Sequence, residues 1–124
     1  MKKIIIVFIC IISIFIITGC DEATETINEA ESSVNEMQKV IKKNNYIIVD
    51  VRTKEEYEEG HVKDSINIPY DEIDENVDLD KDKTIMVYCK SGKRSSIAYS
   101  TLKDLGYDVL DLGAYDTIEL EKTK

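Results

Sequence analysis

Residues 85–95 read Ile-Met-Val-Tyr-Cys-Lys-Ser-Gly-Lys-Arg-Ser. The apolar run 85–88 is typical of a buried β-strand, and it ends directly before Cys89. A short loop that contains Gly92 follows, and a helical pattern begins at Ser95. The segment therefore predicts a strand, a tight loop and a helix, with a thiol where the strand meets the loop.

The surroundings predicted for Cys89 favour a thiolate. The N–H groups of a tight loop converge on one point, and the N-terminus of a helix carries a partial positive charge. Lys90, Lys93 and Arg94 add full positive charges close to the sulfur. Each of these effects lowers the pKa of a thiol and attracts anions. The sequence thus predicts a nucleophilic cysteine in an anion-binding loop.

The N-terminus has the three parts of a secretory signal peptide. Lys2 and Lys3 are followed by the stretch 4–17, which is apolar apart from Ser13. That stretch is 14 residues long, whereas a membrane-spanning helix needs roughly 20. The alternative is an uncleaved N-terminal anchor. In both cases the basic residues stay inside, and the folded part is expected outside the cytoplasm.

The tetrapeptide Ile-Thr-Gly-Cys that ends at Cys20 resembles the lipobox of bacterial lipoproteins. The resemblance implies that Cys20 is acylated and becomes the first mature residue. Two or more acyl chains give stable membrane attachment. We therefore expect residues 1–19 to be a lipoprotein signal peptide and residues 20–33 an acidic, lipid-anchored tether. The domain would then occupy residues 34–124, on the extracytoplasmic face of the cell membrane.

The chain has three cysteines, Cys10, Cys20 and Cys89. Loss of the signal peptide and acylation of Cys20 would leave Cys89 alone, so no intramolecular disulfide is expected. Secreted domains normally pair their cysteines. An unpaired thiol in an oxidising compartment indicates a thiol that is used, although a buried, inert cysteine is the alternative.

The chain is acidic, with 16 basic residues, 25 acidic residues and a formal net charge of −9. Removal of residues 1–19 would take away two basic residues and make it more acidic still. Such a surface argues against nucleic acid as a partner and against electrostatic adhesion to anionic lipid. The basic cluster at 90–94 is a local exception to this charge.

Hydrophobic periodicity predicts one α/β domain with a parallel central sheet flanked by helices. The expected strands are 46–51, 65–68, 84–88 and 107–112. The expected helices are 33–43, 54–59, 70–76, 95–105 and 114–122. Thr53 and Glu56 form a capping-box pattern before the second helix, and Gly106 stops the fourth. The inward positions of that fourth helix are Ile97, Ala98, Thr101, Leu102 and Leu105.

Five fragments, in order, resemble a single-domain rhodanese over residues 34–122. They are Asp-Val-Arg-Thr at 50–53, Glu-Tyr at 56–57, Gly-His-Val at 60–62, Asn-Ile-Pro at 67–69 and Cys-Lys-Ser-Gly-Lys-Arg-Ser at 89–95. The resemblance implies a rhodanese-like fold. It also implies sulfur transfer through a persulfide on Cys89, from a donor such as thiosulfate to an acceptor such as cyanide or a thiol.

The chain departs from this family at its C-terminal end. Members of the family usually have two adjacent glycines there and a Trp five positions after the first. Here Gly113 is followed by Ala114, and Ile118 stands in place of the Trp. This departure concerns packing near the last predicted helix rather than the cysteine loop.

The length of the loop bears on the reaction. Four residues separate Cys89 from Arg94. The related cell-cycle phosphatases, and the arsenate reductases like them, have five residues there and surround a tetrahedral oxyanion. A shorter ring suits the outer sulfur of a persulfide, so we favour sulfur transfer over phosphatase or arsenate reductase activity.

The following roles are expected from the resemblance and from residue chemistry. Cys89 is the nucleophile. The donor-binding residues are Lys90, Ser91, Gly92, Lys93, Arg94 and Ser95. Arg94 either holds the donor's sulfonate or pairs with a neighbouring carboxylate and fixes the loop. Ser95 is expected to cap the following helix, with its hydroxyl able to reach the sulfur.

Structural support is expected from Asp50, Arg52 and His61, with His61 as scaffold rather than general base. One histidine and one free thiol make no metal-ligand cluster, so we expect neither a metal nor another cofactor. The leading hypothesis is a monomeric, lipid-anchored thiosulfate or persulfide sulfurtransferase. The alternative is a persulfide carrier or regulatory module at the membrane with little activity of its own.

Overall fold

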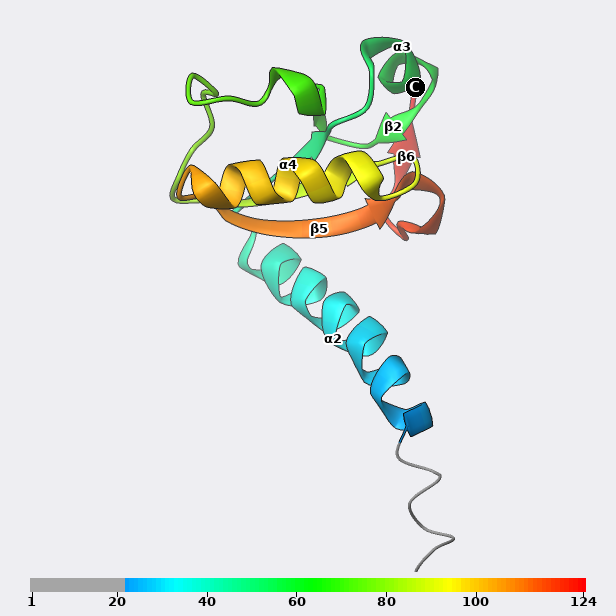
Figure 1. Ribbon diagram of the computed structural model, residues 1–124. Coiled ribbons are helices and arrows are strands. Elements are labelled where there is room, and N and C mark those ends of the chain that lie inside the picture. The colour runs from blue at the N-terminus through cyan, green and yellow to red at the C-terminus, as the bar shows by residue number, and fades with distance from the viewer. Residues whose placement is uncertain (1–21) are drawn as a thin grey trace, which may run out of the picture. The chain divides into compact units, whose positions relative to one another are not determined.

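The computed structural model describes residues 22–124. The helices are α2 (Glu22–Lys43), α3 (Lys54–Glu59) and α4 (Lys93–Asp104), and the 3-10 turns are η1 (Tyr70–Glu72) and η2 (Tyr115–Thr117). The strands are β1 (Tyr46–Asp50), β2 (His61–Val62), β3 (Ile66–Asn67), β4 (Thr84–Cys89), β5 (Asp108–Ala114) and β6 (Lys122–Thr123). Figure 1 shows these elements in chain order.

The chain divides into two compact units, Met1–Glu36 and Met37–Lys124. The predicted signal peptide at 1–19 and the predicted acylation site Cys20 lie outside the described residues. No helix within residues 22–124 is both long enough and apolar enough to cross a bilayer. Helix α2 begins at Glu22, so the segment expected to be a tether is helical over most of its length.

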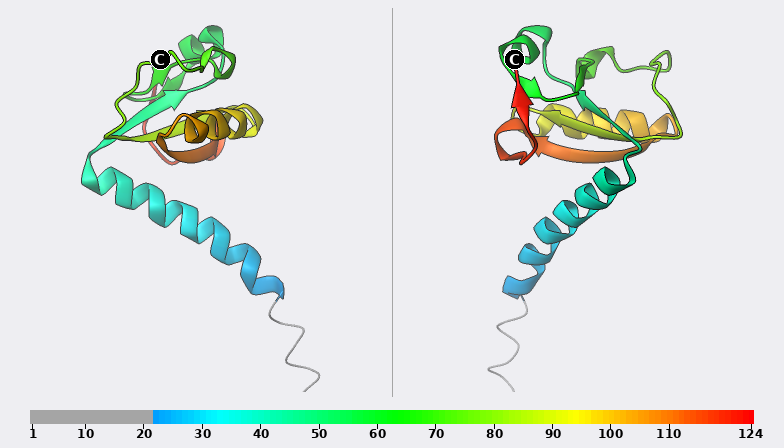
Figure 2. Two further views of the ribbon diagram at one scale, coloured as in Figure 1. Left: turned by 60° about the vertical axis from the view of Figure 1, so that its left-hand side comes forward. Right: turned by 180° about the vertical axis from the view of Figure 1, so that it is seen from behind.

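Four parallel strands form the main sheet in the order β3-β1-β4-β5. Helix α4 packs on β4 and β5, and all three views in Figures 1 and 2 show this packing. This confirms the predicted α/β fold with a parallel sheet flanked by helices. A second, antiparallel pair joins β6 to β2 and carries the C-terminus to the end of α3.

Side chains on β1 and β4 alternate between two hydrophobic clusters, one on each face of the sheet. On β4, Ile85, Val87 and Cys89 belong to the cluster beneath α4, whereas Met86 and Tyr88 belong to the other. All five are fully buried. Burial on both faces explains why these strands read as continuous apolar runs rather than as alternating ones.

The second cluster also includes residues from α2 and from the C-terminal segment. Met37, Val40 and Ile41 from the last turns of α2 pack against it, and Ile118 is buried within it. Ile118, which stands where the Trp was expected from the resemblance, is thus a core residue. The helix predicted at 114–122 is wrong, because this segment forms η2 and then β6.

Helix α4 differs from its prediction at the start and on one face. It begins at Lys93, two residues before the predicted position. Ala98 and Leu102 are buried as expected, but Ile97 is 52% exposed, so its inward placement is wrong. Its end is as predicted, since Gly106 has φ +91° and its N–H bonds to Lys103 O. The adjacent N–H of Tyr107 bonds to Leu102 O, which completes a Schellman motif.

The remaining local predictions are confirmed in part. Helix α3 has the predicted bounds, and its N-cap Thr53 accepts the N–H of Glu56 through Oγ1 at 3.3 Å. The helix predicted at 70–76 is only the 3-10 turn η1. Strand β3 is two residues shorter than predicted, and the two short strands β2 and β6 were not foreseen.

Candidate active site

Cys89 is the last residue of β4, at the carboxyl edge of the parallel sheet, and it is fully buried. Its Sγ accepts the backbone N–H of Gly92 at 2.9 Å. The hydroxyl of Ser95 lies 3.6 Å from the same sulfur. Cys89 is a free thiol. The loop therefore folds back over the sulfur, as the sequence predicts for an anion-binding turn.

Gly92 allows this turn. It is the N-cap of α4 with φ +94°, in the left-handed region that residues with a side chain rarely adopt. Gly113, with φ +77°, lies beside it, since a Cβ at Gly92 would come within 3.8 Å of Gly113 Cα. A bulge between Val87 and Tyr88 in the register of β4 with β5 brings Gly113 to this position.

The predicted helix cap is wrong in one respect. Gly92 occupies the N-cap, and Ser95 lies in the first turn of α4, fully buried. Its Oγ donates to Gly92 O at 3.0 Å. Ser95 therefore ties the loop to the helix and also contacts the sulfur, instead of capping the helix that follows.

The environment of the sulfur favours the thiolate. Burial alone would raise the pKa of Cys89. The N–H and hydroxyl of Ser95 and the N–H groups of Gly92 and Ser91 outweigh burial and lower that pKa below its ordinary value. Hydrogen bonds to the charged form produce this effect, so the loop has the property expected of a reactive cysteine.

The three basic residues of the loop have different partners. Lys90 and Lys93 are exposed, and neither forms an ion pair within residues 22–124. Arg94 instead forms a two-pronged pair with Glu56 of α3, which raises the pKa of Arg94. Of the two roles considered for Arg94, the structure shows pairing with a carboxylate.

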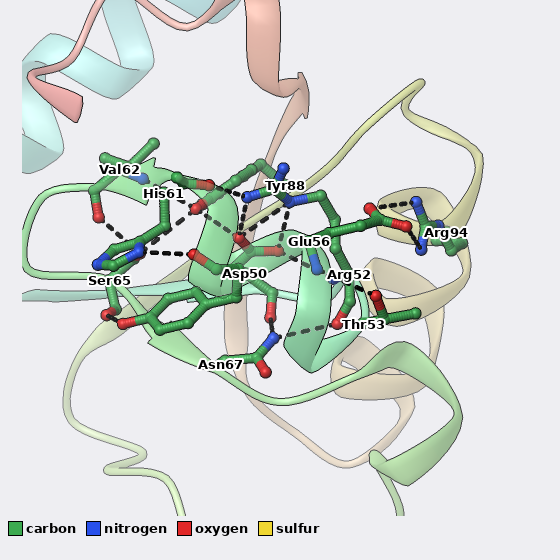
Figure 3. A network of polar contacts seen from close by, with 12 residues as sticks. Asp50, Arg52, Thr53, Glu56, His61, Val62, Ser65, Asn67, Tyr88 and Arg94 are labelled. Carbon is green, nitrogen blue, oxygen red and sulfur yellow. Dashed lines mark hydrogen bonds and ion pairs between the residues drawn. The ribbon is translucent and has the colours of Figure 1, made fainter. Parts of the chain in front are cut away.

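Figure 3 shows a network of polar contacts around Asp50, Arg52 and Tyr88. Tyr88 belongs to the second cluster and Cys89 to the first, so this network lies on the opposite face of the sheet from the sulfur. Arg52 is bound to Asp50 by Nη2 at 2.6 Å and by Nε at 2.9 Å. The Tyr88 hydroxyl donates to Asp50 Oδ2 at 2.7 Å and accepts the N–H of Val62. Burial is the largest cause that raises the pKa of Tyr88, to about 12, so its hydroxyl keeps its proton at neutral pH.

Arg52 connects this network to neighbouring segments. Its Nη2 donates to Gly60 O at 2.7 Å, and its guanidinium lies 4.4 Å from the centre of the Tyr115 ring. The amide of Asn67 donates to Asp50 O and Arg52 O. Asp50 and Arg52 thus hold together β1, the end of α3, β3 and η2, and neither contacts the sulfur in the described part of the chain.

His61 is also bound away from the sulfur. Its Nδ1 lies 2.9 Å from Tyr57 O, and its ring stacks on the Tyr57 ring at 3.8 Å between centroids. No hydrogen bond joins it to Cys89 within residues 22–124. No group of three potential ligand side chains within the same residues could hold a metal ion.

Sequence reasoning missed two participants. Glu56 was noticed as part of a capping box and of the Glu-Tyr fragment at 56–57 but was given no role at the site, and Tyr88 was noticed only as an apolar strand residue. Asp50 and Tyr88 are directly paired in the register of β1 with β4, which explains the hydrogen bond between their side chains. A carboxylate four residues after Arg52 carries no local sign that its partner is Arg94, which is 38 residues away.

The comparisons agree with one another. A family model described as rhodanese-like domain matches residues 33–116. The thiosulfate sulfurtransferase PspE of Escherichia coli is 38% identical over 80 residues, which are 61% of this chain and 77% of that protein. The putative sulfur carrier protein YrkF of Bacillus subtilis is 37% identical over 71 residues, which are 56% of this chain and 38% of that protein.

A solved structure described as a rhodanese with anions from E. coli is similar to this fold. It has a TM-score of 0.59 and 34% sequence identity. The match covers 64% of this chain and 98% of that one.

Proposed function

Because this chain belongs to the rhodanese-like domain family, we propose that it is a sulfurtransferase that carries sulfane sulfur as a persulfide on Cys89. The observation that carries the proposal is the loop around the sulfur, in which hydrogen bonds lower the pKa of a buried thiol. A thiolate with this support is a nucleophile at neutral pH. The name of the relative PspE indicates thiosulfate as a donor.

In the first half-reaction the thiolate of Cys89 attacks the outer sulfur of thiosulfate. A new S–S bond forms to Cys89, the S–S bond of the donor breaks, and sulfite leaves with the electron pair. Negative charge moves from Sγ to the outer sulfur of the persulfide. The Gly92 N–H already points toward Sγ before the reaction begins, so donors of the loop can stabilise charge on the persulfide with little reorganisation.

In the second half-reaction a nucleophilic acceptor such as cyanide or a thiolate attacks the outer sulfur. The S–S bond of the persulfide breaks, the acceptor keeps the sulfur, and Cys89 returns as a thiolate. Lys90 and Lys93 are the loop side chains whose charge can attract an anionic donor. The net charge elsewhere on the chain is negative, so attraction of anions would be confined to this loop.

Trapping of the persulfide tests the proposal. Purified protein is treated with thiosulfate, freed of excess donor and digested, and the peptide that contains Cys89 is weighed. We expect a gain of one sulfur atom on that peptide, reversed by cyanide with release of thiocyanate. An unchanged mass after treatment with thiosulfate and with a persulfide donor would refute sulfur transfer through Cys89.

A persulfide carrier is the second candidate, and the similarity to the putative sulfur carrier YrkF favours it. A carrier forms the same Cys89 persulfide but passes the sulfur to one protein acceptor. Slow turnover with thiosulfate and cyanide, together with rapid loss of sulfur to a co-purified protein, would select the carrier over the enzyme.

We propose further that Cys20 attaches the protein to the outer face of a bacterial membrane. The support is the sequence alone: a basic start, the apolar stretch 4–17 and the lipobox-like tetrapeptide ending at Cys20. Expressed in a bacterium fed labelled palmitate, the parent chain should carry label in the membrane fraction, whereas Cys20→Ser should carry none. Equal labelling of both chains, or an unlabelled parent, would contradict this assignment.

A further inference from the structure

The ion pair between Glu56 and Arg94 joins the two helices whose N-termini follow β1 and β4. Arg94 Nη1 donates to Glu56 Oε1 at 3.1 Å, and Nη2 donates to Oε2 at 3.0 Å. The side chains are 25% and 31% exposed. Figure 3 shows the two side chains facing each other between α3 and α4. A two-pronged, partly buried pair fixes direction as well as distance.

The backbone of Glu56 belongs to the capped first turn of α3. Its N–H is bound to the side chain of Thr53, the N-cap of α3. Thr53 follows Arg52, which is 5% exposed and bound within the buried Asp50 network. The backbone of Glu56 is therefore tied to the domain core, and its carboxylate extends from that backbone to bind Arg94.

Arg94 is covalently joined to Ser95, whose hydroxyl oxygen lies 3.6 Å from Cys89 Sγ. The peptide bond between Arg94 and Ser95 carries the Ser95 N–H, which contributes to the lowered pKa of Cys89. The Ser95 side chain contacts the same sulfur and Gly92 O. A rotation of the first turn of α4 would move the Ser95 N–H and the Ser95 hydroxyl together relative to the sulfur.

We propose that Glu56 is a positioning residue for the reactive sulfur: by holding Arg94 it fixes the Arg94–Ser95 peptide and so keeps the N–H and the side chain of Ser95 beside Cys89. This inference rests on the proposed function only in taking Cys89 as the reacting group. In this proposal Arg94 has a structural role in the loop, and Lys90 and Lys93 are the exposed charges that attract an anionic donor.

The test compares three variants of the full-length chain. Glu56→Ala removes the attachment, Glu56→Gln keeps one acceptor oxygen, and Arg94→Gln removes the other partner. Glu55→Gln is the matched control, since Glu55 is an exposed carboxylate in the same turn of α3. The readout is the rate of iodoacetamide alkylation at the Cys89 peptide as a function of pH, followed by mass spectrometry. Thermal unfolding checks that each variant is folded.

Loss of the attachment weakens hydrogen bonds to a charged sulfur, so alkylation of Glu56→Ala at neutral pH should be about tenfold slower. Its pH profile should move to higher pH, because the neutral thiol gains relative to the thiolate. Glu56→Gln should move in the same direction by less, and Glu55→Gln should match the parent. Glu56→Ala combined with Arg94→Gln should be no slower than either alone, since both remove one interaction.

Two results would overturn the inference. Alkylation profiles of Glu56→Ala and Glu56→Gln that coincide with the parent would show that the sulfur does not sense the pair. Faster alkylation in these variants would show that Glu56 masks the charge of Arg94 instead of positioning it. Should Glu56→Ala fail to fold, Glu56→Gln and Arg94→Gln decide the matter. Alkylation needs no sulfur transfer, so this test can fail while persulfide trapping succeeds, and the reverse.

Discussion

Replacement of Cys89 by serine is expected to abolish turnover of thiosulfate, with a loss of about 10³-fold or more, because a hydroxyl cannot take the place of the thiolate nucleophile. The structure makes this a clean substitution. Serine is only slightly smaller than cysteine, so it leaves little empty space at this fully buried site. The new hydroxyl can still accept the N–H of Gly92. The unfolding temperature should therefore change little while activity disappears.

The measurement is the rate of thiocyanate formation from thiosulfate and cyanide, beside thermal unfolding. Ser96→Ala is the matched control. Ser96 is an exposed residue in the first turn of α4, and its side chain contacts neither the sulfur nor the loop in the described chain. Its rate should equal that of the parent. Turnover that survives in Cys89→Ser would place the reacting group elsewhere.

Asp50→Asn is expected to lower the free energy of unfolding by about 3 to 5 kcal/mol, because the change leaves a buried positive charge without its counter-ion. Asp50 is fully buried and Arg52 is 5% exposed. The carboxylate accepts from the Arg52 side chain, the Arg52 N–H and the Tyr88 hydroxyl. An amide nitrogen at either oxygen position would face donors that have no acceptor left.

For a domain of this size, that loss lowers the unfolding temperature by about 12 °C or more. Urea and thermal unfolding of the two chains measure the difference. Asp116→Asn is the matched control, since Asp116 is exposed in η2, and exposed substitutions usually stay within about 0.5 kcal/mol. A loss below about 1 kcal/mol in Asp50→Asn would show that Arg52 finds sufficient compensation from Gly60 O and the Tyr115 ring.

The elements that could be predicted are those with strong local signals. Strands β1 and β4 are continuous apolar runs, α3 is marked by Thr53, and the end of α4 is marked by Gly106. The wrong predictions are positions where tertiary contacts override a local pattern. Polar and apolar residues alternate ambiguously over 114–122, and this segment forms the turn η2 and then leads into β6, which pairs with His61–Val62.

The start of α4 was predicted two residues late for a related reason. Serine is a preferred residue at helix N-caps, but Gly92 can adopt a positive φ and occupies the N-cap position instead. Ser95 is then placed in the first turn, where its hydroxyl reaches Cys89. The donors that support the sulfur therefore depend on backbone geometry that residue type alone does not specify.

The local order of residues was enough to locate a strand, a glycine turn and a helix around Cys89, because such signals act over a few neighbouring positions and survive in any fold that contains them. The partners of Arg94, Asp50 and Tyr88 were decided by the folded chain, since these contacts join residues 38 positions apart. Opposite charges attract whatever their separation along the chain. Only the register of β1 with β4, and the placement of α3 beside α4, determines which of the many carboxylates of this acidic protein comes within hydrogen-bonding distance.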